Sequence, residues 1–227
     1  RGCVARMRAG VARGPLLRRV LPRGEEVDVV PGFGTDPVGD LAARSGAGVL
    51  QKYDGRALLV TTGACAVHCR YCFRRHFPYD EENASRGSFE PALAAIGRDP
   101  SIREVILSGG DPLSLSDRRL AELFDGLLAV SHVRRLRLHT RLPIVLPERI
   151  DAGFLGLWSA VPLQKVVVVH ANHARELDGS VRAAIESLQS TGTTVLNQAV
   201  LLRGVNDSAD DLVTLSETLF EAGVLPY

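Results

Sequence analysis

The sequence predicts an α/β fold, a partial (β/α)6 TIM-like barrel truncated at its sixth strand. Strand-like and helical segments alternate along most of the chain, which favours parallel strands joined by right-handed crossovers. The strand-like segments are almost continuously apolar, as is typical of parallel strands covered on both faces. Polar residues follow the strands directly, and α/β barrels carry their functional groups on that rim.

The strands are compact and rich in leucine or β-branched residues. We expect them at residues 57–62, 104–108, 136–139, 165–170 and 194–200, with a sixth that begins at 224. The pattern between them predicts helices at 72–77, 91–98, 117–130, 149–159, 180–191 and 208–222. Ser116 and Ser208 are suited to cap two of these helices at their N-termini.

Two regions differ in composition. Residues 1–50 are rich in glycine, proline and arginine, and we expect an extended or partly helical lead-in there. Residues 51–227 form the regular α/β core. Because the sequence stops within the sixth strand, we expect this core to be incomplete at its C-terminus.

Bulk properties narrow the function classes. The net charge of +1 gives no reason to expect direct binding to nucleic acid or to an anionic membrane. No apolar run approaches the roughly 20 residues that span a bilayer, and no signal peptide is apparent. We therefore expect a soluble, cytoplasmic protein in a reducing compartment, where thiols bind metals more often than they form disulfides. Cys3 is the leftover cysteine, a buried or incidental thiol.

The most specific motif is the loop after the first predicted strand. Cys65, Cys69 and Cys72 have the spacing C-x-x-x-C-x-x-C. Three thiolates at this spacing can hold three irons of a 4Fe–4S cluster and leave the fourth iron open. The alternatives are a zinc site completed by His68 or His76, typical of a non-catalytic binding module, and unrelated buried cysteines.

This loop, with Tyr71 before the last cysteine, resembles the signature of the radical S-adenosylmethionine (SAM) superfamily. The resemblance implies that SAM chelates the open iron and is cleaved to a 5′-deoxyadenosyl radical. Ser108, Gly109, Gly110 and Asp111 resemble the superfamily's glycine motif after the second strand, which meets the methionine amino group of SAM. The barrel is thus expected to be of the radical SAM type.

Longer segments resemble the lysine 2,3-aminomutase family. The residues that carry this likeness are 69–79, 107–113, 141–150 and 196–207. Residues 73–79 and the upstream Pro-Gly-Phe-Gly-Thr-Asp-Pro at 31–37 resemble the branch that makes β-lysine for elongation factor P. The resemblance implies an isomerase that converts L-α-lysine to β-lysine with a 4Fe–4S cluster, SAM and pyridoxal 5′-phosphate (PLP). It also implies an electron donor such as flavodoxin or ferredoxin, and a homo-oligomer is possible.

The same resemblance implies roles for individual residues. Arg74 matches the arginine that grips the α-carboxylate of the substrate. His170 and Gln198 match positions that line the PLP and SAM pockets. Three residues match the neighbourhood of the PLP phosphate: Lys52, Tyr53 and Arg56. Lys52 departs from the pattern, because the family usually has arginine there.

One requirement of the family is not met. PLP chemistry needs a lysine for its resting Schiff base, yet the only lysines are Lys52, before the first strand, and Lys165, at the start of the fourth. We therefore expect the PLP lysine and the carboxylates for the substrate's distant ammonium to lie beyond Tyr227, and this fragment to be inactive alone. A radical SAM enzyme without PLP that acts on another substrate remains an alternative, and lysine, glutamate and arginine all remain open as substrates.

Overall fold

The structure is a computed structural model that describes residues 6–7, 14–46, 48–84 and 88–227. Cys3 lies outside the described residues. Within them, eight strands form one sheet whose spatial order follows the chain, from β1 to β8. The sheet is open, with β1 and β8 at its two edges. The predicted α/β fold is confirmed, whereas closure toward a barrel is not.

The predicted parallel strands are confirmed as neighbours in sequence order. They are β3 (Arg56–Thr62), β4 (Glu104–Gly109), β5 (Arg135–Thr140), β6 (Gln164–Val169), β7 (Thr194–Asn197) and β8 (Leu225–Pro226). The strand expected at 194–200 ends three residues early, at Asn197. There the Asn197 side chain bonds both the amide and the carbonyl of Ala171, in the loop after β6.

Two further strands precede the parallel set, where the sequence predicted only a lead-in. β1 (Arg44–Gly46) and β2 (Val49–Tyr53) form an antiparallel extension on β3. The boundary that we expected at residues 50 and 51 therefore falls inside β2. The lead-in also contains α2 (Pro15–Arg18), η1 (Gly24–Val27) and η2 (Leu41–Ala43).

Five of the six predicted helices are confirmed within a few residues. They are α3 (Glu90–Arg98), α4 (Asp117–Leu128), α6 (Ala152–Ser159), α7 (Gly179–Ser190) and α8 (Ala209–Glu221). The hydroxyl groups of Ser116 and Ser208 accept backbone N–H groups at the starts of α4 and α8, as expected. Short helical segments complete the connections: η3 (Pro112–Ser114), α5 (Leu142–Val145), η4 (Pro147–Arg149) and η5 (Ala174–Glu176).

The prediction of a helix at 72–77 was wrong. This stretch is a series of turns, in which the amide of Arg75 bonds the carbonyl of Cys72 and the amide of Phe77 bonds that of Arg74. Pro78 disfavours helical geometry at the residue before it. In addition, the Arg74 side chain is held by Asp40 of the lead-in. The segment is therefore shaped by its partners rather than by helix propensity.

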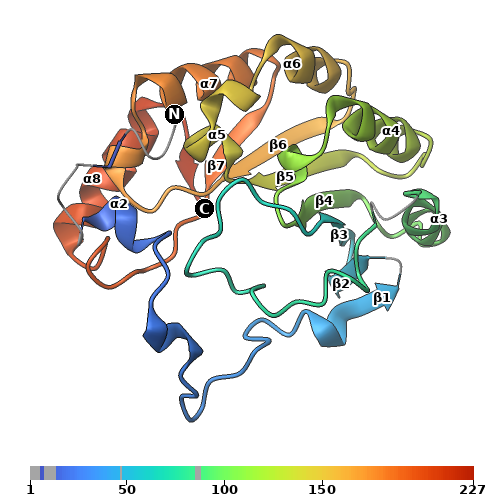
Figure 1. The fold of residues 1–227 in the computed structure, drawn as a ribbon. Coiled ribbons are helices and arrows are strands. Elements are labelled where there is room, and N and C mark those ends of the chain that lie inside the picture. The colour runs from blue at the N-terminus through green and yellow to red at the C-terminus, as the bar shows by residue number, and fades with distance from the viewer. Residues whose placement is uncertain (1–5, 8–13, 47, 85–87) are drawn as a thin grey trace.

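The two faces of the sheet differ in character. Residues such as Leu59, Leu107, Leu138 and Val167 are fully buried in the core that packs beneath the helices. Because side chains alternate along a strand, their neighbours, such as His139, point to the opposite face. Figure 1 shows the large helices on one side of the sheet, and the 63–84 loop and residues 19–43 of the lead-in on the other. No helix in the described part of the chain is long and apolar enough to cross a membrane.

Candidate functional site

The cysteine loop lies between the lead-in and the carboxyl ends of the strands. The amide of Arg70 donates to the carbonyl of Arg19 over 2.8 Å, and its guanidinium bonds the Arg18 carbonyl. Glu26 forms ion pairs with both Arg70 and Arg75. The loop is thus fastened to two separate points of the lead-in, a region in which the sequence predicted no regular strand.

The three cysteines of the loop are free thiols, and Cys72 is the most exposed of them. The Arg141 guanidinium donates a hydrogen bond to the Cys69 sulfur. Burial, with added repulsion from Asp111 and the other two cysteines, raises the pKa of Cys65 to about 12. Among the described residues, no three His, Cys, Asp or Glu side chains converge as a metal site. The donor set itself, three thiols on one loop, fits an iron–sulfur cluster, which would hold them as thiolates.

The glycine turn after β4 packs directly against the start of the cysteine loop. The Gly110 amide donates to the Thr62 carbonyl over 2.6 Å, and the Asp111 amide donates to the Ala64 carbonyl over 2.8 Å. A Cβ atom on Gly110 would lie 2.2 Å from the Ala64 oxygen. Gly109 has a φ of +119°, which also favours glycine. The glycines therefore allow two backbones to meet at a distance that no other residue permits.

The Asp111 carboxylate accepts hydrogen bonds from groups of the protein itself. It accepts the Thr140 hydroxyl over 2.6 Å, the Arg141 amide over 2.7 Å and the Leu113 amide over 3.0 Å. Burial nevertheless raises the pKa of this carboxyl above its ordinary value. Asp111 thereby joins the end of β4 to the end of β5, next to the cysteine loop.

The Arg74 guanidinium is also hydrogen-bonded to other side chains of the protein. Its Nε donates to Asp40 over 2.7 Å and its Nη1 donates to the Ser108 hydroxyl over 2.9 Å. The other oxygen of Asp40 pairs with the Lys52 ammonium at 2.5 Å. Asp40, which the sequence analysis did not single out, therefore joins the predicted site residues Lys52 and Arg74, and Arg74 in turn holds a third, Ser108.

Tyr53 and Arg56 lie elsewhere. They pair across the turn between β2 and β3, at the amino end of β3, whereas the cysteine loop follows its carboxyl end. Six residue steps separate Arg56 from Thr62, about 20 Å of extended strand. Tyr53 is 67% exposed, and the Arg56 guanidinium lies over its ring and 3.9 Å from Glu104.

His170 and Gln198 both lie beside His139, on the face of the sheet opposite the buried core. The sequence analysis did not single out His139. The rings of His139 and His170 pack edge to face with centroids 5.8 Å apart, and a polar interaction with Gln198 partly opposes the lowering of the pKa of His139. Burial, together with nearby positive charge, lowers the pKa of His139 to about 3 and that of His170 to about 4. Both imidazoles are therefore neutral at pH 7.

Because the pKa values of these two histidines are lowered in the folded protein, we expect its stability to depend on pH. Below their ordinary pKa of 6.5 the unfolded chain takes up protons that the folded chain does not bind until about pH 4. Stability should therefore fall as the pH drops from 6.5 to 4, by up to ~1.4 kcal/mol per pH unit for each histidine. Urea unfolding at several pH values should give a smaller slope for a double His139→Gln, His170→Gln variant than for wild type. His132→Gln, in the loop after α4, is the control; equal slopes for wild type and the double variant would refute the assignment.

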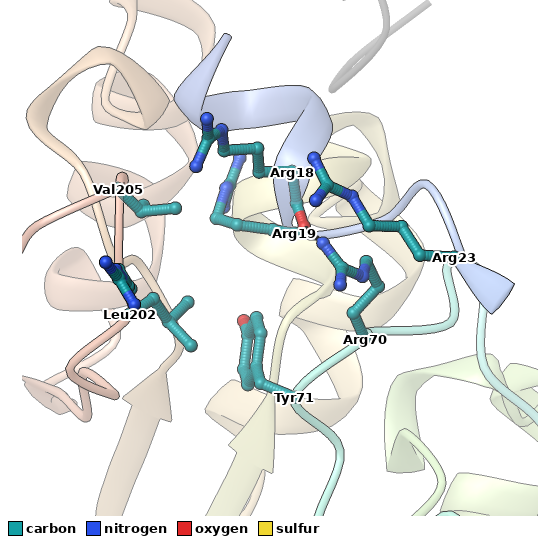
Figure 2. A pocket seen from close by; sticks show the side chains of 8 residues that line it. Arg18, Arg19, Arg23, Arg70, Tyr71, Leu202 and Val205 are labelled. Atoms are coloured by element: carbon teal, nitrogen blue, oxygen red, sulfur yellow. Dashed lines mark hydrogen bonds between the residues drawn. The ribbon is translucent and has the colours of Figure 1, made fainter. Parts of the chain in front are cut away.

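A cavity of about 560 Å³ opens beside Tyr71 of the cysteine loop. Figure 2 shows the arginines of the lead-in and loop around it, with Leu202 and Val205 opposite. Beneath it, the fully buried Arg19 pairs with Glu176, which also lies 3.6 Å from Arg141. The Arg141 guanidinium stacks over the Tyr71 ring at 5.4 Å. Among the described residues, the buried Tyr71 hydroxyl has no hydrogen-bond partner.

Neither lysine is placed to attach PLP at this site. The Lys52 ammonium is engaged by Asp40 and by the Val38 carbonyl. Lys165 lies at the amino end of β6 and points to the carbonyls of Trp158 and Ser159, while the site lies at the carboxyl ends of the strands. The described residues therefore do not fit a covalently attached PLP.

Together, the fold and the site define a class: an α/β protein with a polar, cysteine-bearing site at the carboxyl ends of its parallel strands. No family model matches the chain. It is similar over its whole length to the L-lysine 2,3-aminomutase of Escherichia coli, at 46% identity, and over 99% of its length to that of Haemophilus influenzae, at 44%. The enzyme of Buchnera aphidicola is 40% identical. The chain spans 66% of the length of each. It belongs to the lysine 2,3-aminomutase family.

Proposed function

We propose that this chain is the cluster- and substrate-binding part of a lysine 2,3-aminomutase of the radical SAM type, which converts L-α-lysine to β-lysine. The single observation that carries the proposal is the 40–46% identity to proteins of that name. The geometry supports it, because three free thiols, a tight glycine turn and a buried arginine lie around the same strand ends. On this proposal the open sheet is part of an incomplete (β/α)6 barrel.

The residues divide the work by their chemistry. Cys65, Cys69 and Cys72 are the residues that would hold a 4Fe–4S cluster, and Gly109 and Gly110 shape the backbone turn beside it, where SAM would bind. When bound, the cluster and SAM supply the radical that starts the reaction. Arg74 binds the substrate carboxylate with its charged, planar guanidinium. The neutral His139 and His170 line the inner face of the sheet without adding charge.

PLP is the second cofactor that the family implies, and we assign no step to it. Lys52 is the one predicted PLP-phosphate residue that lies with Arg74, while Tyr53 and Arg56 lie at the other end of β3. Neither Lys52 nor Lys165 is placed to attach PLP. An electron donor such as flavodoxin or ferredoxin, a homo-oligomeric state, a cytoplasmic location and the modification of elongation factor P as the use of β-lysine all stay predictions.

The test is turnover by the full-length protein. After anaerobic reconstitution with iron and sulfide, and with SAM, PLP, a reductant and L-lysine, we expect β-lysine to accumulate, as measured by mass spectrometry. Glutamate and arginine in place of lysine test the other substrates. Turnover without PLP would favour the radical SAM enzyme that lacks this cofactor. One zinc per chain, with no iron or sulfide, would instead indicate a zinc-stabilised module.

A further inference from the structure

Asp40 is a buried carboxylate that the sequence analysis did not single out, and it lies between two cations. Its side chain is 3% exposed, and its two oxygens face two different cations, Lys52 at 2.5 Å and Arg74 at 2.7 Å. Although burial by itself would raise the pKa of Asp40, these cations hold it below its ordinary value. Asp40 is therefore ionised when the protein is folded at neutral pH.

Hydrogen bonds within the surrounding turn hold the Asp40 carboxylate toward Arg74. Asp36 accepts the amides of Asp40 and Leu41 through its two oxygens, both at 2.9 Å. Lys52 also donates to the Val38 carbonyl over 2.6 Å. Asp36 thus ties the two ends of the turn at 36–41 together, Lys52 holds its middle, and the Asp40 side chain contacts Arg74 of the cysteine loop.

The charges of this cluster do not balance. One carboxylate, Asp40, faces two cations, and the third partner, Ser108, is neutral. A net charge of +1 therefore remains next to Arg74, whose side chain is 7% exposed. Lys52 is 29% exposed, so water solvates part of its charge, whereas the Arg74 guanidinium lies in a buried place, where unbalanced charge is costly. A second carboxylate at Arg74 would balance the charge of the cluster. An amino-acid substrate brings such a group.

We propose that Asp40 is a positioning residue for the amino-acid carboxylate: it holds the Nε edge of Arg74, and the remaining positive charge of the cluster receives the α-carboxylate of the substrate. The inference rests on the proposed function, because that function supplies an amino-acid substrate. Asp40 neutralises one of the two cations, while Ser108 fixes a terminal nitrogen of the same guanidinium. Arg74 is thereby oriented before the ligand arrives, which lowers the entropic cost of binding.

The test compares two ligands that differ only in the carboxylate. L-lysine carries it, and 1,5-diaminopentane does not. With the reconstituted full-length protein, Asp40→Asn should raise the Kd and KM of L-lysine roughly tenfold or more, with a smaller change in kcat. The Kd of 1,5-diaminopentane should stay within about twofold. Asp40→Glu, which keeps the charge, should recover most of the lysine affinity.

Controls separate positioning from folding. Glu122→Gln removes a carboxylate that also faces two arginines, Arg118 and Arg119, but on the exposed side of α4, and should change neither ligand's affinity. If Asp40→Asn does not fold, Asp36→Ala loosens the same turn and should give a smaller effect that is again selective for L-lysine.

Three results would overturn the proposal: an equal loss of affinity for both ligands, unchanged lysine affinity, or tighter lysine binding in Asp40→Asn. Wild-type protein that binds no lysine would count against the proposed function and with it this inference. Wild-type binding that Asp40→Asn leaves intact would count against Asp40 alone.

Discussion

Replacing any one of Cys65, Cys69 and Cys72 by alanine is expected to abolish cluster assembly and lysine turnover. Each thiolate would hold a different iron, and the loop holds only these three cysteines. Loss of one cysteine leaves two of the four irons without a protein ligand. The two remaining cysteine ligands are too few to hold the cluster stably. Wild-type protein should take up about four irons and four sulfides per chain and show broad visible absorbance; the variants should contain less than about a tenth of this amount.

Cys3→Ala is the matched control, since it removes the fourth cysteine of the chain, which lies outside the C-x-x-x-C-x-x-C motif. It should keep the full iron and sulfide content. Each loop variant should remain folded by far-ultraviolet circular dichroism, because the cysteines are not part of the hydrophobic core. A variant of Cys65, Cys69 or Cys72 that still binds about four irons would refute the ligand assignment.

Gly110→Ala is expected to destabilise the protein by about 3 kcal/mol or more, at the upper end of overpacking effects, and to prevent cluster assembly. The new methyl group would lie 2.2 Å from the carbonyl oxygen of Ala64. That atom belongs to the backbone, so relief requires the start of the cysteine loop to move away from β4. The movement would break the hydrogen bonds from the Gly110 amide to Thr62 at the end of β3 and from the Asp111 amide to Ala64 of the loop.

Urea unfolding measures the stability, and iron content after reconstitution measures the effect on the site. Gly156→Ala is the control: it lies in α6, and a methyl group there meets no atom within 4 Å. This control should be neutral or gain up to about 1 kcal/mol from helix propensity. Equal urea midpoints for Gly110→Ala and wild type would show that the loop can move at little cost.

The regular part of the fold was predictable because its signal is local. Short apolar runs and amphipathic segments alternate, and each is interpretable within a window of ten to fifteen residues. Ser116 and Ser208 marked helix starts for the same reason. The lead-in gave no such signal, so β1 and β2 were missed: their pairing with β3 is a tertiary contact. The turns at 72–77 were mistaken for a helix because their shape depends on Asp40 and on other distant partners.

The site divides in the same way. The spacing of the three cysteines and the double glycine after β4 are properties of the sequence alone. Both can therefore be recognised without knowledge of the tertiary structure. Asp40, Glu176 and His139 carried no recognisable pattern, since a single aspartate in a glycine-rich stretch resembles any turn residue. Their importance arises from burial beside cations or beside a second imidazole.

The sequence by itself determined the order of parallel strands, the thiol set and the family, because periodicity, spacing and identity are written along the chain. Only the tertiary structure decided that the lead-in extends the sheet and fastens the cysteine loop, and that Arg74 and Lys52 share one buried carboxylate. The physical reason is that electrostatic and packing contacts depend on distance in space. Asp40 and Arg74, 34 residues apart in the chain, form a 2.7 Å bond that no local pattern encodes.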